Sequence, residues 1–147
     1  MSGYWILKTE PSTYSFDQLE RERTAVWDGV RNPLALKHLG QMRPSDPVLI
    51  YHTGAEKSVV GRAEVTRAAY PDPKEKDAKL VVVELKALGR LAKPVPLSVI
   101  KADRAFADLG LVRMGRLSVV PATESQFRML VEMGKGEGGT GKGKTAS

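Results

Sequence analysis

The sequence contains no cysteine, which excludes disulfides, thiolate catalysis and metal centres held by cysteine sulfur. Long apolar runs are also missing, and the longest, such as residues 80–83, are far too short to cross a bilayer. The amino terminus has no basic stretch followed by an apolar core, so no secretory signal is visible. We therefore expect a soluble intracellular protein in the cytoplasm, with the nucleoid as an alternative location.

Residue patterns that accompany common cofactors and reactions are scarce. The two histidines, His38 and His52, stand fourteen residues apart without a partner motif, so we expect no metal site. The chain lacks a Gly-x-Ser-x-Gly elbow, a phosphate-binding loop in its folded part and a dinucleotide fingerprint. A Ser/His/acid triad stays open on sequence alone. We expect a binding module without a cofactor rather than an enzyme.

The chain of 147 residues fits one domain with one sizeable core. Its net charge is +6, of which residues 134–147 contribute +2 and the remainder +4, a mild basic bias compatible with an anionic partner. Residues 134–147 are rich in glycine and lysine without an apolar anchor, which predicts a disordered tail. The folded domain is expected to span residues 1–133.

The hydrophobic pattern predicts short strands with helices inserted between them. Strands are expected at residues 4–8, 47–51, 59–65, 80–88 and 117–120, the second and third joined by a turn around Gly54. Helices are expected after the capping boxes 15–18 and 123–126, over residues 33–42 after the N-cap Asn32, and as turns at 96–101 and 103–109. Five or six mostly antiparallel strands with inserted helices indicate an α+β fold, a small and partly open barrel.

Three polar clusters stand at expected strand ends or helix starts. Trp27, Arg31 and Asn32 fall in a short segment before the helix at Pro33 and offer a stacking face, bidentate donors and a donor–acceptor amide. Taken alone, a buried tryptophan, an N-cap and a surface ion pair explain these residues better. Residues 8–11 and 51–53 form the other clusters, and all three could meet at one barrel mouth.

Together, several segments resemble the signature of the EVE domain family, in order over residues 4–131. They are Tyr-Trp-Ile-Leu-Lys-Thr-Glu-Pro at 4–11, Tyr-Ser-Phe-Asp-Gln-Leu at 14–19, Trp-Asp-Gly-Val-Arg-Asn at 27–32, Tyr-His-Thr at 51–53 and Leu-Ser-Val-Val-Pro at 117–121. The chain is thus similar to the thymocyte nuclear protein family and to stand-alone bacterial EVE proteins. The resemblance implies a PUA-like pseudobarrel that reads a modified base, with modified cytosine in DNA as the expected target.

The resemblance also implies site residues. Trp27 is expected to form an aromatic wall of the base pocket, Asn32 to hydrogen-bond the base, and Ser118 to lie on a strand bordering the pocket. The remaining pocket residues are expected to be Lys8, Thr9 and Glu10 on the floor, Tyr51 and His52 at the rim, and Asp28 beside Trp27. Contacts with phosphate are expected from Arg31, Lys37 and Arg116.

The sequence departs from the family at three places. Pro33 follows Asn32 where an aromatic residue is usual, and Asp46–Pro47 replaces a usual Gly-Asp pair, which removes a backbone donor. Residues 70–83 lack a tryptophan, so Tyr70 is the expected candidate for a second aromatic wall. These changes concern the ligand and the phosphate contacts more than the fold.

The leading hypothesis is that a base leaves its stack and inserts beside Trp27. Three alternatives stay open at this point. The first is a module that binds modified RNA of the tRNA type. The second is a hydrolase or glycosylase that acts on the flipped base, with Glu10 or Asp28 as general base. The third is an adaptor that binds another protein.

Overall fold

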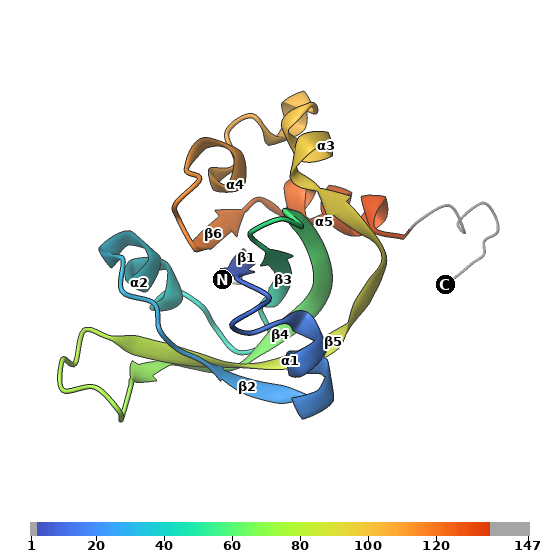
Figure 1. Ribbon diagram of the computed structural model, residues 1–147. Coiled ribbons are helices and arrows are strands. Elements are labelled where there is room, and N and C mark those ends of the chain that lie inside the picture. The colour runs from blue at the N-terminus through green and yellow to red at the C-terminus, as the bar shows by residue number, and fades with distance from the viewer. Residues whose placement is uncertain (1–2, 136–147) are drawn as a thin grey trace.

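The structure is a computed structural model that describes residues 3–135 and consists of one curled, six-stranded mixed sheet with short helices around it (Figure 1). The strand order is β2-β5-β4-β3-β1-β6. The strands are β1 (Tyr4–Thr9), β2 (Thr24–Trp27), β3 (Pro47–His52), β4 (Ser58–Pro71), β5 (Val81–Pro96) and β6 (Val119–Ala122). The helices are α1 (Phe16–Glu22), α2 (Pro33–Leu39), α3 (Leu97–Lys101), α4 (Gly110–Arg113) and α5 (Glu124–Met133), with a 3₁₀ helix η1 (Arg104–Phe106).

The sheet contains one parallel pair, β1–β3, in which Leu7 lies opposite Ile50. Both side chains are fully buried, and most residues of the two strands are buried. Parallel strands are usually covered on both faces, which is why these segments read as nearly continuous apolar runs. The other strand pairs are antiparallel, including β1 with β6, so the predicted, mostly antiparallel sheet is confirmed.

The strands β4 and β5 form a long hairpin that extends well beyond the predicted ranges 59–65 and 80–88. Their pairing is interrupted by several register shifts, for example between Val59 and Gly61 and between Val65 and Arg67. Such bulges bend and twist a strand pair, and Figure 1 shows the hairpin curling around β1 and β3. The sheet stays open, because β2 and β6 lie at its two ends. Irregular pairing of this kind breaks the strict alternation on which the shorter predictions rested.

The predicted helix starts are confirmed. Ser15 and Thr123 each form a capping box with the glutamine three residues later, and Asn32 caps α2 with Pro33 in the first turn. The helix α2 ends at Leu39 rather than at residue 42, because Gly40 follows and has low helix propensity.

Three details of the prediction are wrong. The strand β2 was not expected, and Trp27 is its last residue rather than part of a connecting segment. The helix α4 was not expected either, and the last strand begins at Val119 instead of residue 117. Each of these elements has only four residues, too few for a periodic pattern to show. Of the predicted disordered tail, residues 136–147 lie outside the described residues.

Candidate functional site

An open cavity of about 840 Å³ lies beside the ends of β1 and β2 and the segment 28–31 that leads to α2. This volume is within the range of about 300–1,000 Å³ that is common for small-molecule sites. It is lined by Lys8, Thr9, Thr13, Tyr14, Glu22, Thr24, Ala25, Val26, Trp27, Asp28, Gly29, Val30, Arg31, Glu84 and Ser118. The cavity therefore combines an aromatic wall with cationic, anionic and hydroxyl groups.

The aromatic wall consists of Trp27 and Tyr14. Trp27 ends β2 and is 7% exposed, and Tyr14 lies immediately before the N-cap of α1 and is half-buried. Their ring centroids are 6.0 Å apart and the ring planes meet at 84°, an edge-to-face arrangement that is favourable for aromatic pairs. The pair holds both rings in place and gives the cavity an aromatic corner before any ligand binds.

Two hydrogen bonds fix the position of Tyr14. The Thr9 hydroxyl donates to the Tyr14 carbonyl oxygen at 2.6 Å, and the Tyr14 hydroxyl donates to a carboxylate oxygen of Glu22 at 2.6 Å. Burial, followed by the hydrogen bond and charge of Glu22, raises the pKa of Tyr14 well above the usual value for a phenol. The phenol therefore stays protonated at physiological pH, and Glu22 is occupied as its acceptor.

Lys8 brings a cation to the cavity from the end of β1. Its Nζ donates to the Gly115 carbonyl oxygen at 2.8 Å and lies 5.9 Å from the centre of the Tyr51 ring. Burial lowers the pKa of Lys8 below the usual lysine value. The backbone N–H of Lys8 also donates to the Ser118 carbonyl oxygen at 2.9 Å, which joins the two sides of the cavity.

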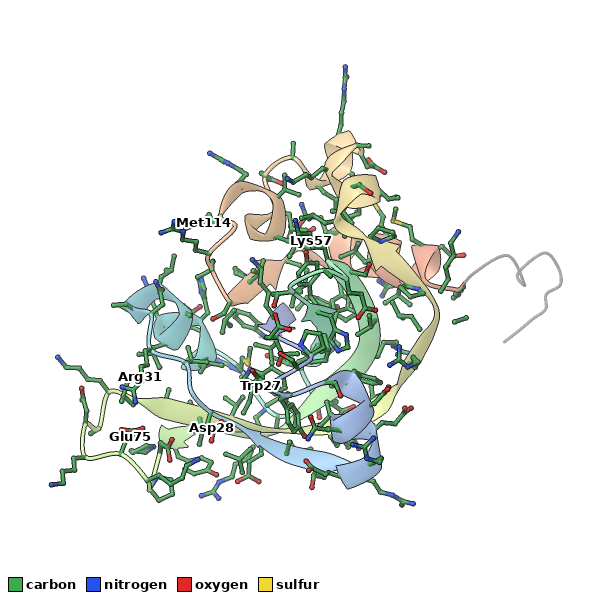
Figure 2. The ribbon with its side chains drawn as sticks, viewed as in Figure 1. Trp27, Asp28, Arg31, Lys57, Glu75 and Met114 are labelled. Carbon is green, nitrogen blue, oxygen red and sulfur yellow. The ribbon has the colours of Figure 1, made fainter. Side chains whose placement is uncertain are left out.

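The segment 28–31 is held by the tip of the β4–β5 hairpin. Lys74 forms an ion pair with Asp28, and the Nη2 of Arg31 lies 3.0 Å from a carboxylate oxygen of Glu75. Figure 2 shows Arg31 beside Glu75, with Asp28 between this pair and Trp27. Both charged residues of the segment are thus engaged by the hairpin while most of the Arg31 side chain, 66%, stays exposed.

Of the twelve site residues expected from sequence, half line this cavity. They are Lys8, Thr9, Trp27, Asp28, Arg31 and Ser118. The other six are Glu10, Asn32, Lys37, Tyr51, His52 and Arg116, and none of them is among the described residues of its lining. Ligand contact stays a prediction for all twelve.

Several of the six have other partners. The Asn32 side-chain oxygen accepts from the Ala35 N–H at 3.0 Å as the cap of α2, and Tyr51 is 3% exposed within the core. Lys37 is exposed on α2. Arg116 lines a neighbouring groove to which Asn32 also contributes.

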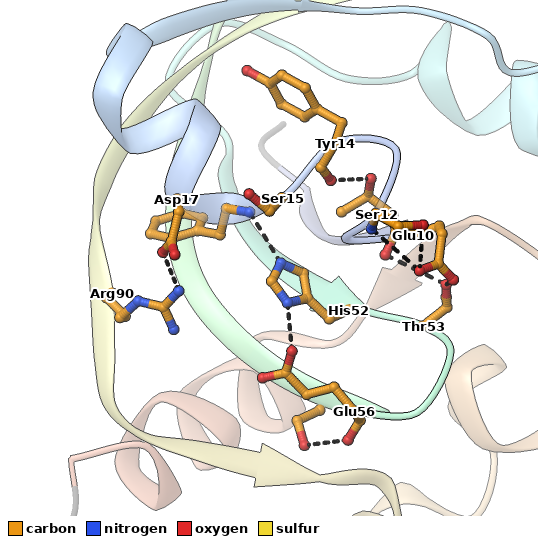
Figure 3. Close-up of polar contacts among 12 residues, drawn as sticks. Glu10, Ser12, Tyr14, Ser15, Asp17, His52, Thr53, Glu56 and Arg90 are labelled. Atoms are coloured by element: carbon orange, nitrogen blue, oxygen red, sulfur yellow. Dashed lines mark hydrogen bonds and ion pairs between the residues drawn. The ribbon is translucent and has the colours of Figure 1, made fainter.

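His52 and Glu10 organise the chain around the start of α1 (Figure 3). The Nε2 of His52 accepts from the Phe16 N–H at 3.0 Å, while its Nδ1 lies 2.8 Å from a carboxylate oxygen of Glu56. Glu10 accepts from the Ser12 hydroxyl at 3.1 Å. These contacts support the loop and the helix rather than facing the cavity.

Tyr70, the expected second aromatic wall, is absent from the described lining. Its hydroxyl donates to Glu84 at 2.6 Å, and the Arg67 guanidinium lies 4.0 Å from the centre of its ring. Tyr14 supplies the second ring instead. In the sequence, Tyr14 stood out only as the residue before a capping box. Its place in segment 14–19, which resembles the EVE domain signature, was the signal that could have identified it as a pocket residue.

The part of the chain that the structure describes holds no group of three or more histidine or acidic residues able to bind a metal ion. None of its helices is both long enough and apolar enough to cross a membrane.

Comparison with known proteins places the chain among relatives of the same fold. The EVE domain model matches residues 3–133. A Rhodopseudomonas palustris protein solved by NMR is 40% identical, covers 90% of this chain and 92% of its own, and superposes with a TM-score of 0.85. Mouse thymocyte nuclear protein 1 is 28% identical, over 90% of this chain and 74% of its own.

A further similar structure is the crystal structure of the human THYN1 protein in complex with 5-methylcytosine containing DNA. It is 23% identical, with 91% of this chain and 98% of that chain covered and a TM-score of 0.83, a likeness of fold. The predicted PUA-like architecture, an open mixed sheet with short helices, is thereby confirmed. With a family match over nearly all of the described residues, this chain belongs to the EVE domain family.

Proposed function

We propose that this protein binds nucleic acid and reads a modified base, specifically a modified cytosine in DNA, which it takes into the cavity beside Trp27. The observation that carries the proposal is the aromatic corner formed by Trp27 and Tyr14 in an open cavity with Lys8 and Arg31 at its wall. The human THYN1 protein, similar in fold, was crystallised with 5-methylcytosine containing DNA, which supports the same ligand class here.

The energetics favour a base that pairs or stacks poorly in its own strand. Removing a base from its stack costs a few kcal/mol, and stacking on an aromatic side chain returns about 1–3 kcal/mol. The part of the unstacking cost that aromatic stacking does not offset must be compensated by other contacts inside the cavity. A methyl group on the base adds apolar surface, and burying one such group is favourable by about 0.8 kcal/mol. The preference for the modified base is therefore modest and depends on a close fit to the walls.

Asp28 is suited to recognise cytosine. Carboxylates accept hydrogen bonds from the exocyclic amino group of cytosine, and Asp28 stands directly after Trp27 in the lining. The other two acidic residues of the lining already accept hydrogen bonds from tyrosine, Glu22 from Tyr14 and Glu84 from Tyr70. Among the described residues, Asp28 is held only by an exposed ion pair with Lys74, whose ammonium group can turn to solvent. We therefore assign the contact with the amino group to Asp28, which exchanges Lys74 for the base.

The deciding experiment is the substitution Trp27→Ala, with binding measured on matched oligonucleotides that contain 5-methylcytosine or cytosine. We expect the preference for the modified base to vanish while a weaker, salt-sensitive affinity stays, since phosphate contacts do not depend on the ring. Trp27→Phe keeps a flat ring and should retain part of the preference. Tyr4→Ala is the matched control, because Tyr4 packs on Phe127 with ring centroids 5.3 Å apart, away from the cavity lining.

A Trp27→Ala protein that folds and keeps the full preference would overturn the proposal. RNA of the same sequence serves as competitor, and displacement of the DNA by that RNA would move the target class to modified RNA. Release of a free base during long incubation would reveal a glycosylase instead of a reader.

A further inference from the structure

A second groove, of about 390 Å³, lies between the start of α2 and the loop that connects α4 with β6. It is lined by Asn32, Leu34, Arg113, Met114, Gly115, Arg116 and Leu117. Among these described lining residues none is acidic, whereas the first cavity contains Glu22, Asp28 and Glu84. The two hollows thus differ in charge, and the second one is the more favourable place for an anion.

The two hollows lie next to each other, and a ridge formed by residues 31–32 and 117–118 separates them. Arg31 lines the first and the next residue, Asn32, lines the second, while Ser118 lines the first and the preceding Leu117 lines the second. Lys8 in the first cavity donates to the carbonyl oxygen of Gly115 in the second groove, at 2.8 Å. A ligand that fills the first cavity and continues as a chain therefore reaches the second groove by crossing this ridge.

The cations of the second groove are available to a ligand. Arg113 and Arg116 are exposed, and neither forms an ion pair within the described residues, 3–135. By contrast, Arg31 at the first cavity is held by Glu75. Two guanidinium groups without a carboxylate partner match a phosphate, which accepts paired hydrogen bonds from arginine.

The groove also presents apolar surface that the fold leaves uncovered. Among the large hydrophobic side chains of the described chain, five are exposed, and two of these, Met114 at 46% and Leu34 at 36%, lie in this groove. Figure 2 shows Met114 on the loop before β6, projecting outward. A methionine side chain adapts to irregular apolar surfaces and makes favourable contacts with aromatic rings. Sugar carbons or the face of a base fit such a surface.

We propose that the second groove binds the nucleotide adjacent to the read base in the same strand. Its phosphate lies between Arg113 and Arg116, and its sugar or base packs on Met114 and Leu34. This inference rests on the proposed function of the first cavity and adds to it a second contact that is independent of the modification. The first cavity supplies the choice of base, and the second groove supplies strand affinity.

The test uses a single-stranded pentanucleotide with 5-methylcytosine at its centre, made with ordinary phosphates or with neutral methylphosphonates on both sides of that base. The wild-type protein should lose about tenfold in affinity when the linkages are neutral, since hydrogen bonds to charged groups contribute about 1.5–3 kcal/mol. The double variant Arg113→Gln/Arg116→Gln should bind the ordinary ligand about tenfold more weakly and lose nothing further with the neutral one. Its salt slope should fall by about 0.7 for the phosphate contact removed.

The matched control is Lys93→Gln/Lys101→Gln, which changes the net charge equally at two exposed lysines outside both linings. This control should respond to the neutral linkages as the wild type does. Met114→Ala should weaken binding of both ligands, and Met114→Leu should restore it.

Two results separate the failure of this inference from that of the proposed function. If the double arginine variant loses as much affinity on the neutral ligand as the wild type, the second groove does not hold the phosphate and the inference is overturned. If that variant still prefers 5-methylcytosine while Trp27→Ala does not, the reading function stands regardless. A wild-type protein that binds none of these oligonucleotides would overturn both.

Discussion

Tyr14 and His52 are ring side chains close to the start of α1. Tyr14 lines the cavity, whereas His52 is buried away from it. Tyr14 meets Trp27 edge to face and lines the larger cavity. His52 is 3% exposed, and both of its ring nitrogens contact protein groups, the Phe16 N–H and the Glu56 carboxylate. The tyrosine is therefore placed to touch a ligand, whereas the histidine is placed to support the first turn of α1.

The substitution His52→Ala tests this division. It leaves the buried Phe16 N–H without its acceptor, which should lower the free energy of unfolding by about 1–3 kcal/mol. The preference for the modified base should not change, because the ring does not line the cavity. Urea unfolding and oligonucleotide binding measure the two effects. Glu56→Gln serves as control with little effect, since Glu56 is 41% exposed, and a selective loss of base preference in His52→Ala would contradict the assignment.

Lys8 is a residue that we expect to help binding at the expense of stability. Its pKa is lower in the folded protein than in the unfolded chain because burial disfavours the charged form. The unfolded chain therefore binds more protons between the two pKa values, and stability rises with pH through that window. Lys8 thus opposes folding most at neutral pH and below, and this opposition disappears above the usual lysine pKa of 10.5.

Lys8→Met should accordingly raise the thermal unfolding temperature at pH 7 and weaken oligonucleotide binding. The gain in stability should shrink as the pH approaches 10.5. Thermal unfolding at several pH values measures the first effect, and titration with DNA measures the second. A variant that is less stable at pH 7 would show that the hydrogen bond to Gly115 outweighs the effect of burial.

Among the elements, the β4–β5 hairpin contacts the segment 28–31 at the cavity although it lies more than forty residues further along the chain. Its tip carries Lys74 and Glu75, which pair with Asp28 and Arg31 across the segment before α2. Exposed ion pairs of this type contribute only about 0–1 kcal/mol to stability. Their main effect is to set the direction of two charged side chains at the mouth of the cavity.

Glu75→Gln should release Arg31 for a phosphate and tighten DNA binding by about two- to fivefold, the equivalent of about 0.5–1 kcal/mol. The stability should change little. The control is Glu132→Gln, which removes the same charge from an exposed pair with Lys135 at the end of α5. Equal gains in the two variants, measured by fluorescence titration, would show a general charge effect and no role for the Arg31–Glu75 pair.

The elements also show which features could be predicted from sequence. The capping boxes at Ser15 and Thr123 were predicted correctly because all of their atoms come from four consecutive residues. The strand β2 was missed because its four residues are too few to show a pattern and its pairing with β5 joins residues about sixty positions apart. For the same reason, the place of Tyr14 beside Trp27 and the hairpin clamp on Arg31 could not be derived. Hydrogen bonds within a few consecutive residues can be predicted from sequence, whereas a cavity depends on contacts between residues far apart in the chain.

For the whole molecule, the distribution of charge matters more than its sum. The net charge of +6 is modest, and the larger cavity is itself lined by both signs. The groove beside it has only the two arginines as charged lining residues among those described. The molecule thus offers one hollow suited to a polar, uncharged base and another suited to a phosphate, an arrangement that a count of lysines and arginines does not reveal.

The pairing of β1 with β6 has a consequence for how the protein is made. The first strand of the chain gains its second neighbour only when residues 119–122 are present, and Lys8 meets the Ser118 carbonyl in the same step. A ribosome releases the chain from its amino end, so this edge of β1 stays open until residues 119–122 have left the ribosome. Contacts so distant in sequence also form late and slowly in folding. A nascent chain therefore has no finished cavity, and the proposed binding of nucleic acid requires the completed domain.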